Sequence, residues 1–338
     1  MYIIFVESNR GTLLRAMKDA GLCPRMLGSL LTLDCSRGQL LELLNTVPVE
    51  ILKKLKISTA SEEDLKSPYR LLEIGFRAVE AEKFVEEGMF EHLMEVTGGV
   101  ETYFHAIVEA KTGKVFGFEA LCRAQVPVYK LFKISDRVAK ITEYLCREKA
   151  LLEYVARFDQ TYHLFLNLHP KFFRDPLEHV GELETSFQLK GVPPRSVVVE
   201  INEYEGMDLN AMKMIKEFLK NAGVKMALDD VGAGYAGLYQ LIEINPDIAK
   251  LDIELVRDVH RNPLKANILR KLVEACKDSG IITLAEGVEK KEELEFLLEV
   301  GVDLLQGFIF AKPNPYPSVS EIEKKAYNLL KVQVGGAP

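Results

Sequence analysis

Short apolar runs alternate with amphipathic segments of helical period through most of the chain after residue 100. Two of these runs, 102–110 and 114–122, flank a turn at 111–113 and predict a β-hairpin. The later runs are separated by helical segments, a pattern typical of parallel strands joined by helices. The later strands are expected at 163–168, 197–202, 225–229, 248–252, 281–285 and 304–308, with helices at 136–158, 210–222, 265–278 and 291–300.

The two hairpin strands and the six later strands make eight. This count predicts an α/β fold, a (β/α)8 TIM-like barrel in which the hairpin makes one strand antiparallel. We assign residues 101–338 to this barrel. Barrels of this kind carry their functional groups at the C-terminal ends of the strands, so the site is expected there.

The first hundred residues have a different pattern. Residues 1–60 predict a small α/β module, with strands at 2–6 and 30–33, helices at 12–20 and 38–44, and Ser36 as a helix cap. It contains no recognisable motif, and its size suits a regulatory or assembly role. Residues 61–100 predict a helical connector, with apolar residues at helical spacing over 69–95. This helix could carry a signal or form a dimer seam, or it could simply pack on the neighbouring domain.

Composition and charge restrict the function. The net charge of −7 and the pI near 5.6 argue against a nucleic-acid polymer held by a basic surface. No apolar run reaches the roughly 18 residues of a membrane helix, and no signal-peptide core is evident. We therefore expect a cytoplasmic protein with no membrane partner.

The cysteines and histidines offer little obvious chemistry. The five cysteines are scattered without CxxC spacing, so reduced thiols are expected rather than a disulfide framework. The six histidines form no HxH or HxxxH pair, which makes a zinc site built on histidines improbable.

The stretch 224–238 carries the clearest chemical signal. An apolar run of buried-strand type ends on Asp229 and Asp230 and passes into a glycine-punctuated loop. Neighbouring side chains on a strand point to opposite faces, so the two aspartates can converge only where the chain leaves the strand. Two close carboxylates stay ionised cheaply only beside a cation. An acidic turn without function is the alternative when this stretch is considered alone.

Charged or amide residues recur at the ends of the other predicted strands. They are Glu119, Asn167, Glu200, Lys250 with Asp252, Glu286 and Gln306. For Lys250 and Asp252 the alternative is a salt bridge that fills the barrel core. Glu203 and Glu289 each lie three residues beyond a rim glutamate, and each could equally be a helix cap or loop charge.

This set of oxygen ligands suits a hard divalent cation, with Mg²⁺ or Mn²⁺ the best match. Carboxylates around two ions, with a lysine beside them, suit in-line attack of an activated water on a phosphorus ester. Cations near the lysine would lower its pKa and prepare it to orient or deprotonate that water. The residues alone thus predict a metal-dependent barrel hydrolase of a phosphoester.

Seven motifs in order make residues 101–315 resemble the EAL-domain family of cyclic di-GMP phosphodiesterases. The motifs are FEALCR at 118–123, LNLHP at 166–170, EINE at 200–203, LDDVGAGYAGL at 228–238, IAKLD at 248–252, AEGVE at 285–289 and LLQGFIFAKP at 304–313. The resemblance implies hydrolysis of cyclic di-GMP to linear pGpG, with Mg²⁺ or Mn²⁺, two ions per site, in a homodimer.

The resemblance also implies roles for individual residues. The metal ligands would be Glu119, Asn167, Glu200, Asp229, Asp230 and Glu286. Lys250, Glu286 and Asp230 would be catalytic; Arg123, Leu121, Gln306 and Asp252 would contact substrate; Glu203 and Glu289 would stabilise loops.

The chain also departs from the family pattern. Val231, Ala233 and Ala236 replace the usual Phe, Thr and Ser of the loop after the paired aspartates, and Ala124 replaces the Trp after Arg123. These departures bear on regulation and affinity. They keep open a second interpretation, a weak or inactive cyclic di-GMP receptor that signals through the N-terminal module. A metal-dependent barrel hydrolase with another substrate is a third.

Overall fold

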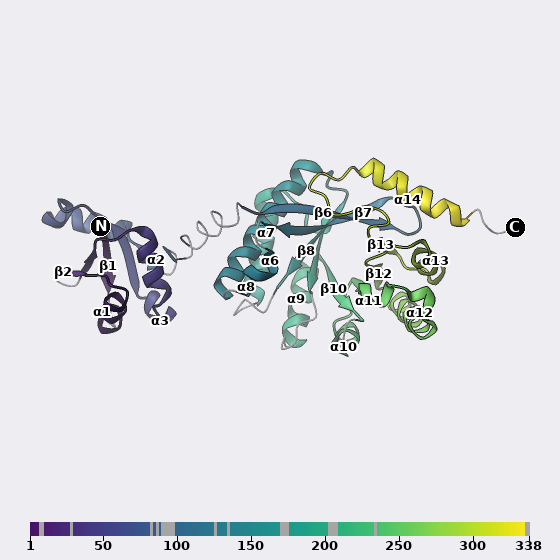
Figure 1. Cartoon of the computed structure of the whole chain (residues 1–338), viewed down its shortest axis with the longest axis horizontal. Coiled ribbons are helices and arrows are strands. Elements are labelled where there is room, and N and C mark those ends of the chain that lie inside the picture. The colour runs from purple at the N-terminus through teal and green to yellow at the C-terminus, as the bar shows by residue number, and fades with distance from the viewer. Residues whose placement is uncertain are drawn as a thin grey trace. The chain divides into compact units, whose positions relative to one another are not determined.

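The computed structural model divides into two compact units, Met1–Gly99 (the N-terminal unit) and Val100–Pro338 (the barrel unit). Each unit is described by itself (Figure 1). The structure describes residues 1–6, 10–27, 30–81, 84–85, 88, 99–124, 127–133, 136–169, 176–201, 209–232 and 235–334. No helix within these residues combines the length and the apolar character needed to cross a membrane.

The N-terminal unit is built on a five-stranded sheet with the order β2-β3-β1-β4-β5. The central strand β1 pairs antiparallel with both β3 and β4, and its Ile3 and Ile4 are fully buried. Ser36 caps α2 as expected, since its side chain accepts a hydrogen bond from the Gln39 backbone. The elements are β1 (Tyr2–Val6), α1 (Arg10–Asp19), β2 (Arg25–Leu27), β3 (Leu30–Leu33), α2 (Arg37–Asn45), α3 (Val49–Leu52), β4 (Leu55–Thr59), α4 (Pro68–Arg77) and β5 (Val79–Glu80).

The expectation of one helix over 69–95 is wrong. Helix α4 starts at Pro68, with Ser67 as its cap, and ends at Arg77. Ala78 is extended, and β5 then pairs antiparallel with β4. Helical spacing of apolar residues could not reveal this ending, because the available edge of β4 is a tertiary feature. Residues 89–98 lie outside the described residues, and the role of 61–100 as a connector stays a prediction.

The barrel unit has the eight predicted strands and the four predicted helices, here α7, α9, α12 and α13, together with further helices that the sequence analysis did not name. The strands are β6 (Glu101–Glu109), β7 (Val115–Arg123), β8 (His163–Leu168), β9 (Val197–Ile201), β10 (Lys225–Val231), β11 (Ile248–Leu251), β12 (Ile282–Ala285) and β13 (Leu304–Gln306). The helices are α6 (Val128–Leu131), α7 (Asp136–Arg157), α8 (Pro176–Lys190), α9 (Leu209–Asn221), α10 (Tyr235–Ile244), α11 (Ile253–Val256), α12 (Pro263–Asp278), α13 (Lys291–Val300) and α14 (Val319–Val334).

The eight strands close into a barrel in the order β10-β11-β12-β13-β6-β7-β8-β9. Strand β6 runs antiparallel to both of its neighbours, β13 and β7, which confirms the prediction of one antiparallel strand. At Gly117 the neighbouring strand approaches closely, since a Cβ there would lie 2.2 Å from the His163 carbonyl oxygen. Only glycine fits at this position of β7.

Two apolar cores hold the barrel. One lies between the strands and the helices, where α7 contributes Leu151 and Tyr154. The other is a layer inside the barrel. Its buried members are Ile107, Phe165, Val198, Ala227, Ile248, Leu284 and Leu304. This inner layer forms an apolar floor, one residue from nearly every strand, below the rim.

The cysteine expectation is wrong for one pair. Cys122 on β7 and Cys146 on α7 form a disulfide, with their Cα atoms 5.4 Å apart. A separation of 24 residues carries no such signal in the sequence. It is the packing of α7 against β7 that brings the two side chains together. Cys23, Cys35 and Cys276 are free thiols.

Candidate metal and catalytic site

The predicted rim residues form the polar layer directly above the apolar floor. Side chains two positions apart on a strand lie on the same face. The residue two positions after a floor residue therefore also points into the barrel, and in these strands it is polar. The pairs are Phe165 with Asn167, Val198 with Glu200, Ala227 with Asp229, Ile248 with Lys250, Leu284 with Glu286, and Leu304 with Gln306. Glu119 on β7 takes the same position two residues after Gly117. The structure therefore brings these predicted residues together.

Lys250 is the centre of this layer. Its side chain is 1% exposed, and its Nζ lies 2.9 Å from Glu200 Oε1 and 2.9 Å from Asp229 Oδ1. Glu286 Oε1 is nearer still, at 2.7 Å. Glu119 Oε1 lies at 3.9 Å. Carboxylates from four different strands or strand ends thus surround one ammonium group.

The charges of the layer are strongly interdependent. Burial alone would lower the pKa of Lys250, but the surrounding carboxylates, Glu200 and Glu286 foremost, raise it well above its usual value. The ammonium therefore stays protonated among these carboxylates. The lowered pKa expected for this lysine beside metal cations stays a prediction.

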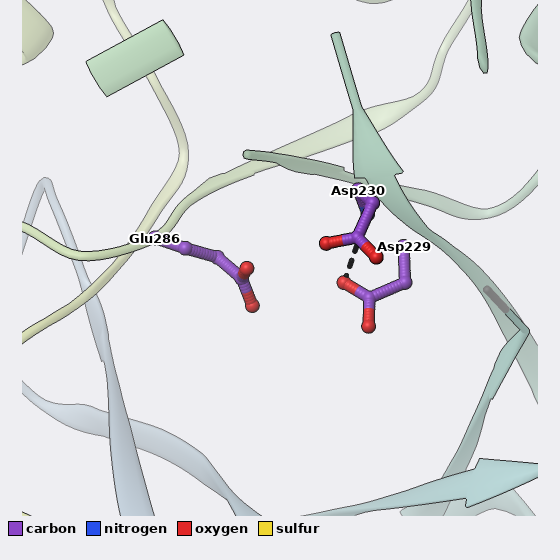
Figure 2. Close-up of side chains that lie close together, drawn as sticks. All are labelled: Asp229, Asp230 and Glu286. Carbon is purple, nitrogen blue, oxygen red and sulfur yellow. Dashed lines mark hydrogen bonds between the residues drawn. The ribbon is translucent and has the colours of Figure 1, made fainter. Parts of the chain in front are cut away.

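Three carboxylates lie together at one edge of the layer (Figure 2). One oxygen each from Asp229, Asp230 and Glu286 lie within 4.8 Å of one another. Asp230 has a left-handed backbone, with φ of 55°, and its N–H donates to Asp229 Oδ1 over 3.0 Å. This turn lets two consecutive side chains approach the same space, as the sequence argument required.

Two carboxyl groups of the layer, Glu200 and Glu286, resist ionisation because they are buried. Burial raises the pKa of Glu200 well above its usual value, and it raises that of Glu286 to about 8. Lys250 offsets only part of this effect. Glu200 Oε1 is paired with Lys250, whereas Glu200 Oε2 is buried without a hydrogen-bond partner. A group of carboxylates around a single ammonium, with one buried carboxylate oxygen still without a partner, fits hard divalent cations.

Glu119 is held by amide side chains. Gln306 Nε2 donates to Glu119 Oε2 over 2.9 Å, and Asn167 Nδ2 donates to Glu119 Oε1 over 3.4 Å. Burial by itself raises the pKa of Glu119, but Lys250 and these donors outweigh it, so the net pKa is lowered. Glu119 therefore ionises more readily than Glu200 and Glu286, whose pKa values are raised.

The residues predicted to contact substrate do not all lie in the polar layer. Leu121 and Arg123 follow Glu119 at alternate positions on β7 and so share its face. Arg123 is exposed, and its guanidinium lies 5.8 Å from the centre of the Tyr103 ring. Asp252 lies just past β11 and caps α11, accepting a hydrogen bond from the Glu254 N–H over 2.7 Å. The Asp252 carboxylate thus bonds the backbone of α11 and not the ammonium group of Lys250.

Of the two predicted loop-stabilising residues, Glu203 lies outside the described residues, as does Ala233. Glu289 is exposed. The carboxylate that holds this loop is Glu293, which is 1% exposed and accepts from the N–H groups of Asp258, Glu289 and Lys290. Glu293 is the third residue of α13, and its carboxylate accepts from the N–H of the preceding cap residue Lys290, as the glutamate of a capping box does, while the Lys290 side chain makes no capping hydrogen bond.

His105 completes the layer on the eighth strand and was missed. It lies opposite Glu119 in the β6–β7 register, and its buried Nε2 has no hydrogen-bond partner. Burial lowers its pKa, against the opposing effect of Glu119. Because β6 is antiparallel, its rim residue lies towards the amino end of the strand. Pairing β6 with β7 in the predicted hairpin would have placed His105 opposite Glu119. A search of the C-terminal ends of the strands could not identify it.

The barrel, its polar rim and the order of the motifs agree with the comparison against known families. The EAL domain model matches residues 91–313, more than half of the chain. This chain belongs to the EAL domain family. The EAL signature residues themselves are Glu119, Ala120 and Leu121 on β7.

Several characterised proteins are similar to this chain in sequence. The blue light- and temperature-regulated antirepressor BluF of Escherichia coli is 28% identical over 66% of this chain and 57% of its own length. The cyclic di-GMP phosphodiesterase RocR of Pseudomonas aeruginosa is 29% identical over 64% of this chain and 58% of its own length. The chain thus spans less than two thirds of these curated EAL relatives.

Solved EAL structures share the fold. A standalone EAL protein from Vibrio cholerae, bound to cyclic di-GMP, is 30% identical and superposes with a TM-score of 0.60, covering 64% of this chain and 92% of that one. Klebsiella pneumoniae BlrP1, in a complex with calcium and cyclic di-GMP, is 25% identical with a TM-score of 0.59. This match covers 93% of this EAL chain and 95% of BlrP1, so it extends into the N-terminal unit.

Proposed function

We propose that this chain is a metal-dependent phosphodiesterase that hydrolyses one phosphodiester of cyclic di-GMP to give linear pGpG. One observation carries the proposal: Lys250 is surrounded by Glu119, Glu200, Asp229 and Glu286 at one rim of the barrel. Relatives support the choice of substrate, since RocR is named a cyclic di-GMP phosphodiesterase and the Vibrio cholerae protein binds this nucleotide.

The residues that would hold divalent cations are the oxygen donors of the layer. They are Glu119, Asn167, Glu200, Asp229, Asp230 and Glu286. We propose two ions per site, Mg²⁺ or Mn²⁺, and the calcium in the BlrP1 complex supports a divalent ion. Such ions would supply Lewis acidity and would acidify a water molecule for attack on phosphorus.

The chain's own groups would share the remaining work. Lys250, as a buried ammonium, would orient the attacking water and offset the charge that develops on the phosphate. Glu286 and Asp230 would accept or hold protons at the same edge. Arg123, with Leu121 on the same strand face, would receive the phosphate and base of the substrate, and Gln306 would keep Glu119 oriented. We include Asp252 as a substrate contact through its remaining carboxylate oxygen and Glu289 as a loop-stabilising residue.

The decisive experiment is incubation of the purified protein with cyclic di-GMP and Mg²⁺ or Mn²⁺, with the products separated by chromatography. We expect metal-dependent formation of pGpG that stops when a chelator is added. Nucleotide that binds but survives would instead support the receptor interpretation. Cleavage of other phosphodiesters, with cyclic di-GMP left intact, would indicate a different barrel hydrolase.

Assembly and location complete the proposal. We propose a homodimer in the cytoplasm, with the N-terminal unit as its regulatory part and no membrane or nucleic-acid polymer as partner. The acidic net charge of −7 supports the exclusion of a polymer. Light scattering of the full chain tests the oligomeric state, and cell fractionation tests the location.

A further inference from the structure

The last four residues of β7, 120–123, project beyond the strand's pairing with β8, and we call them the β7 overhang. The register between β7 and β8 ends at Glu119, which pairs with Phe165. The register between β7 and β6 continues to Arg123, which pairs with Glu101. Glu119 is therefore held by strands on both sides, whereas the overhang is held by a strand on one side only.

The Cys122–Cys146 disulfide is the attachment on the other side of the overhang. Side chains alternate along the strand, so Cys122 points towards α7 while Leu121 and Arg123 point with Glu119 towards the site. Arg123 also donates from Nη1 to the Cys122 carbonyl over 3.0 Å. The Cys122–Cys146 disulfide is thus adjacent in sequence to Arg123, an exposed cation of the rim.

Helix α7 makes a further contact with a site strand, one turn before Cys146. The carboxylate of Glu143 accepts a hydrogen bond from the His169 N–H over 3.3 Å. His169 lies two residues after Asn167, just past the end of β8. One helix therefore holds the ends of two neighbouring strands that carry site residues, covalently at β7 and by a hydrogen bond at β8.

We propose that Cys122 and Cys146 form a thiol–disulfide exchange site, open to dithiol reductants and disulfide oxidants, that sets substrate affinity through the β7 overhang. The ligand affected is cyclic di-GMP, and in this respect the inference rests on the proposed function. Both cysteines are half-buried and so can be reached by a small reagent, whereas Cys276 is buried.

The exchange is a two-electron reaction. A thiolate of the dithiol attacks one sulfur of the Cys122–Cys146 bond, and the other sulfur leaves as a thiolate and takes up a proton. The second thiolate of the reagent then attacks the mixed disulfide and releases the second protein thiol. The protein gains two electrons and two protons, and the reagent becomes a cyclic disulfide. Oxidation by a small disulfide reverses these steps and yields two reduced reagent thiols.

The direction of the effect follows from what the bond restrains. With the bond intact, Arg123 and Leu121 are preorganised, so ligand binding costs less ordering of the chain. Reduction releases the overhang but leaves Glu119 between two strands, so the metal site is unaffected. We expect reduction to weaken nucleotide binding about fivefold or more while kcat changes little. By reciprocity, bound nucleotide should make the bond harder to reduce by the same factor.

The experiment uses the full chain in oxidised and dithiol-reduced forms. Thiols are counted, the Kd for cyclic di-GMP is measured in chelator, and KM and kcat are measured with Mn²⁺. Amide exchange is followed by mass spectrometry over 120–124, with β10 as the internal reference. The Cys122→Ser/Cys146→Ser variant should resemble the reduced protein under both conditions, and Cys23→Ser, an exposed cysteine of the N-terminal unit, should resemble the wild type.

The expected result is a gain of two thiols on reduction, from three to five, with faster exchange at 120–124 and a higher Kd and KM. Five thiols in the oxidised protein, or equal exchange and affinity in the two forms, would overturn the proposal. If neither form cleaves the nucleotide but Kd and exchange still differ, the proposed hydrolysis fails and the exchange site stands. Should the double variant fail to fold, the comparison of the two wild-type forms still decides.

Discussion

Lys250 Nζ lies 2.7 Å from Glu286 Oε1, so a buried ammonium on β11 bonds the carboxylate that follows the neighbouring strand β12. This lysine supplies the positive charge at the centre of a group of carboxylates. Divalent cations, if bound by the same carboxylates, would compete with the ammonium for them. The lysine is therefore expected to affect both the stability of the barrel and its activity with metal.

The first prediction concerns this lysine. Lys250→Met keeps an apolar chain of similar length but leaves the four carboxylates without their ammonium. Turnover should fall at least about 100-fold because the group that orients the water is lost. Without metal, the free energy of unfolding should fall by about 3–5 kcal/mol. Product chromatography and urea unfolding measure the two effects, with Lys324→Met, on the exposed side of α14, as the control. Unchanged turnover in Lys250→Met would remove the lysine from the mechanism.

The second prediction separates metal binding from stability. Glu200→Gln keeps the volume of a fully buried side chain but removes its charge. Metal affinity should fall at least about tenfold, because two buried oxygens no longer offer a carboxylate. The metal-free protein should keep or gain stability, since burial already raises the pKa of Glu200. Calorimetric titration with Mn²⁺ tests this, with the exposed Glu217→Gln on α9 as the matched control. A Glu200→Gln variant that binds Mn²⁺ normally would contradict its role as a ligand.

The third prediction concerns the loop after β12. Glu293 accepts three backbone N–H groups, so Glu293→Gln turns an NH₂ group towards donors and leaves at least one of them unpaired. We expect a loss of about 1–3 kcal/mol in the free energy of unfolding. The adjacent, exposed Glu292→Gln should change it little. Urea denaturation of both variants measures the difference, and equal midpoints would show that the loop does not depend on this carboxylate.

The fourth prediction concerns pH. Burial and the nearby Lys225 lower the pKa of His163, whose Nε2 lies 3.0 Å from Lys225 Nζ. The unfolded chain titrates near its ordinary value of about 6.5 and so takes up a proton that the folded barrel resists. Stability is present above this pH and is lost as the pH falls through the lower folded pKa. Thermal unfolding between pH 8 and pH 5 should therefore drop less steeply in His163→Gln than in the wild type, and identical slopes would refute the assignment.

Much of the barrel could be read from the sequence because its signals are local. Alternating apolar runs and helical periods predicted all eight strands, and the hairpin turn at 111–113 predicted the antiparallel one. The rim residues followed from the same periodicity, since a polar residue two positions beyond a buried one lies next to it on the same face. Even the convergence of Asp229 and Asp230 was expected from their place at a strand end.

Other features depend on contacts between distant segments. The end of the connector helix at Arg77 depends on the edge of β4, and the position of His105 depends on the register of an antiparallel strand. Lys250 appeared from the sequence to share a face with Asp252, but the carboxylate of Asp252 caps α11 instead.

The sequence by itself determined the strand and helix order, the closed barrel and the choice of residues at its rim, because periodicity and motif order are properties of neighbouring positions. Only the tertiary structure decided which charges meet and which thiols bond. Lys250 reaches four carboxylates, and Cys122 reaches Cys146, because barrel closure and helix packing bring segments from different parts of the chain within a few ångströms. Interactions between such segments depend on distance in space, which spacing along the chain does not record.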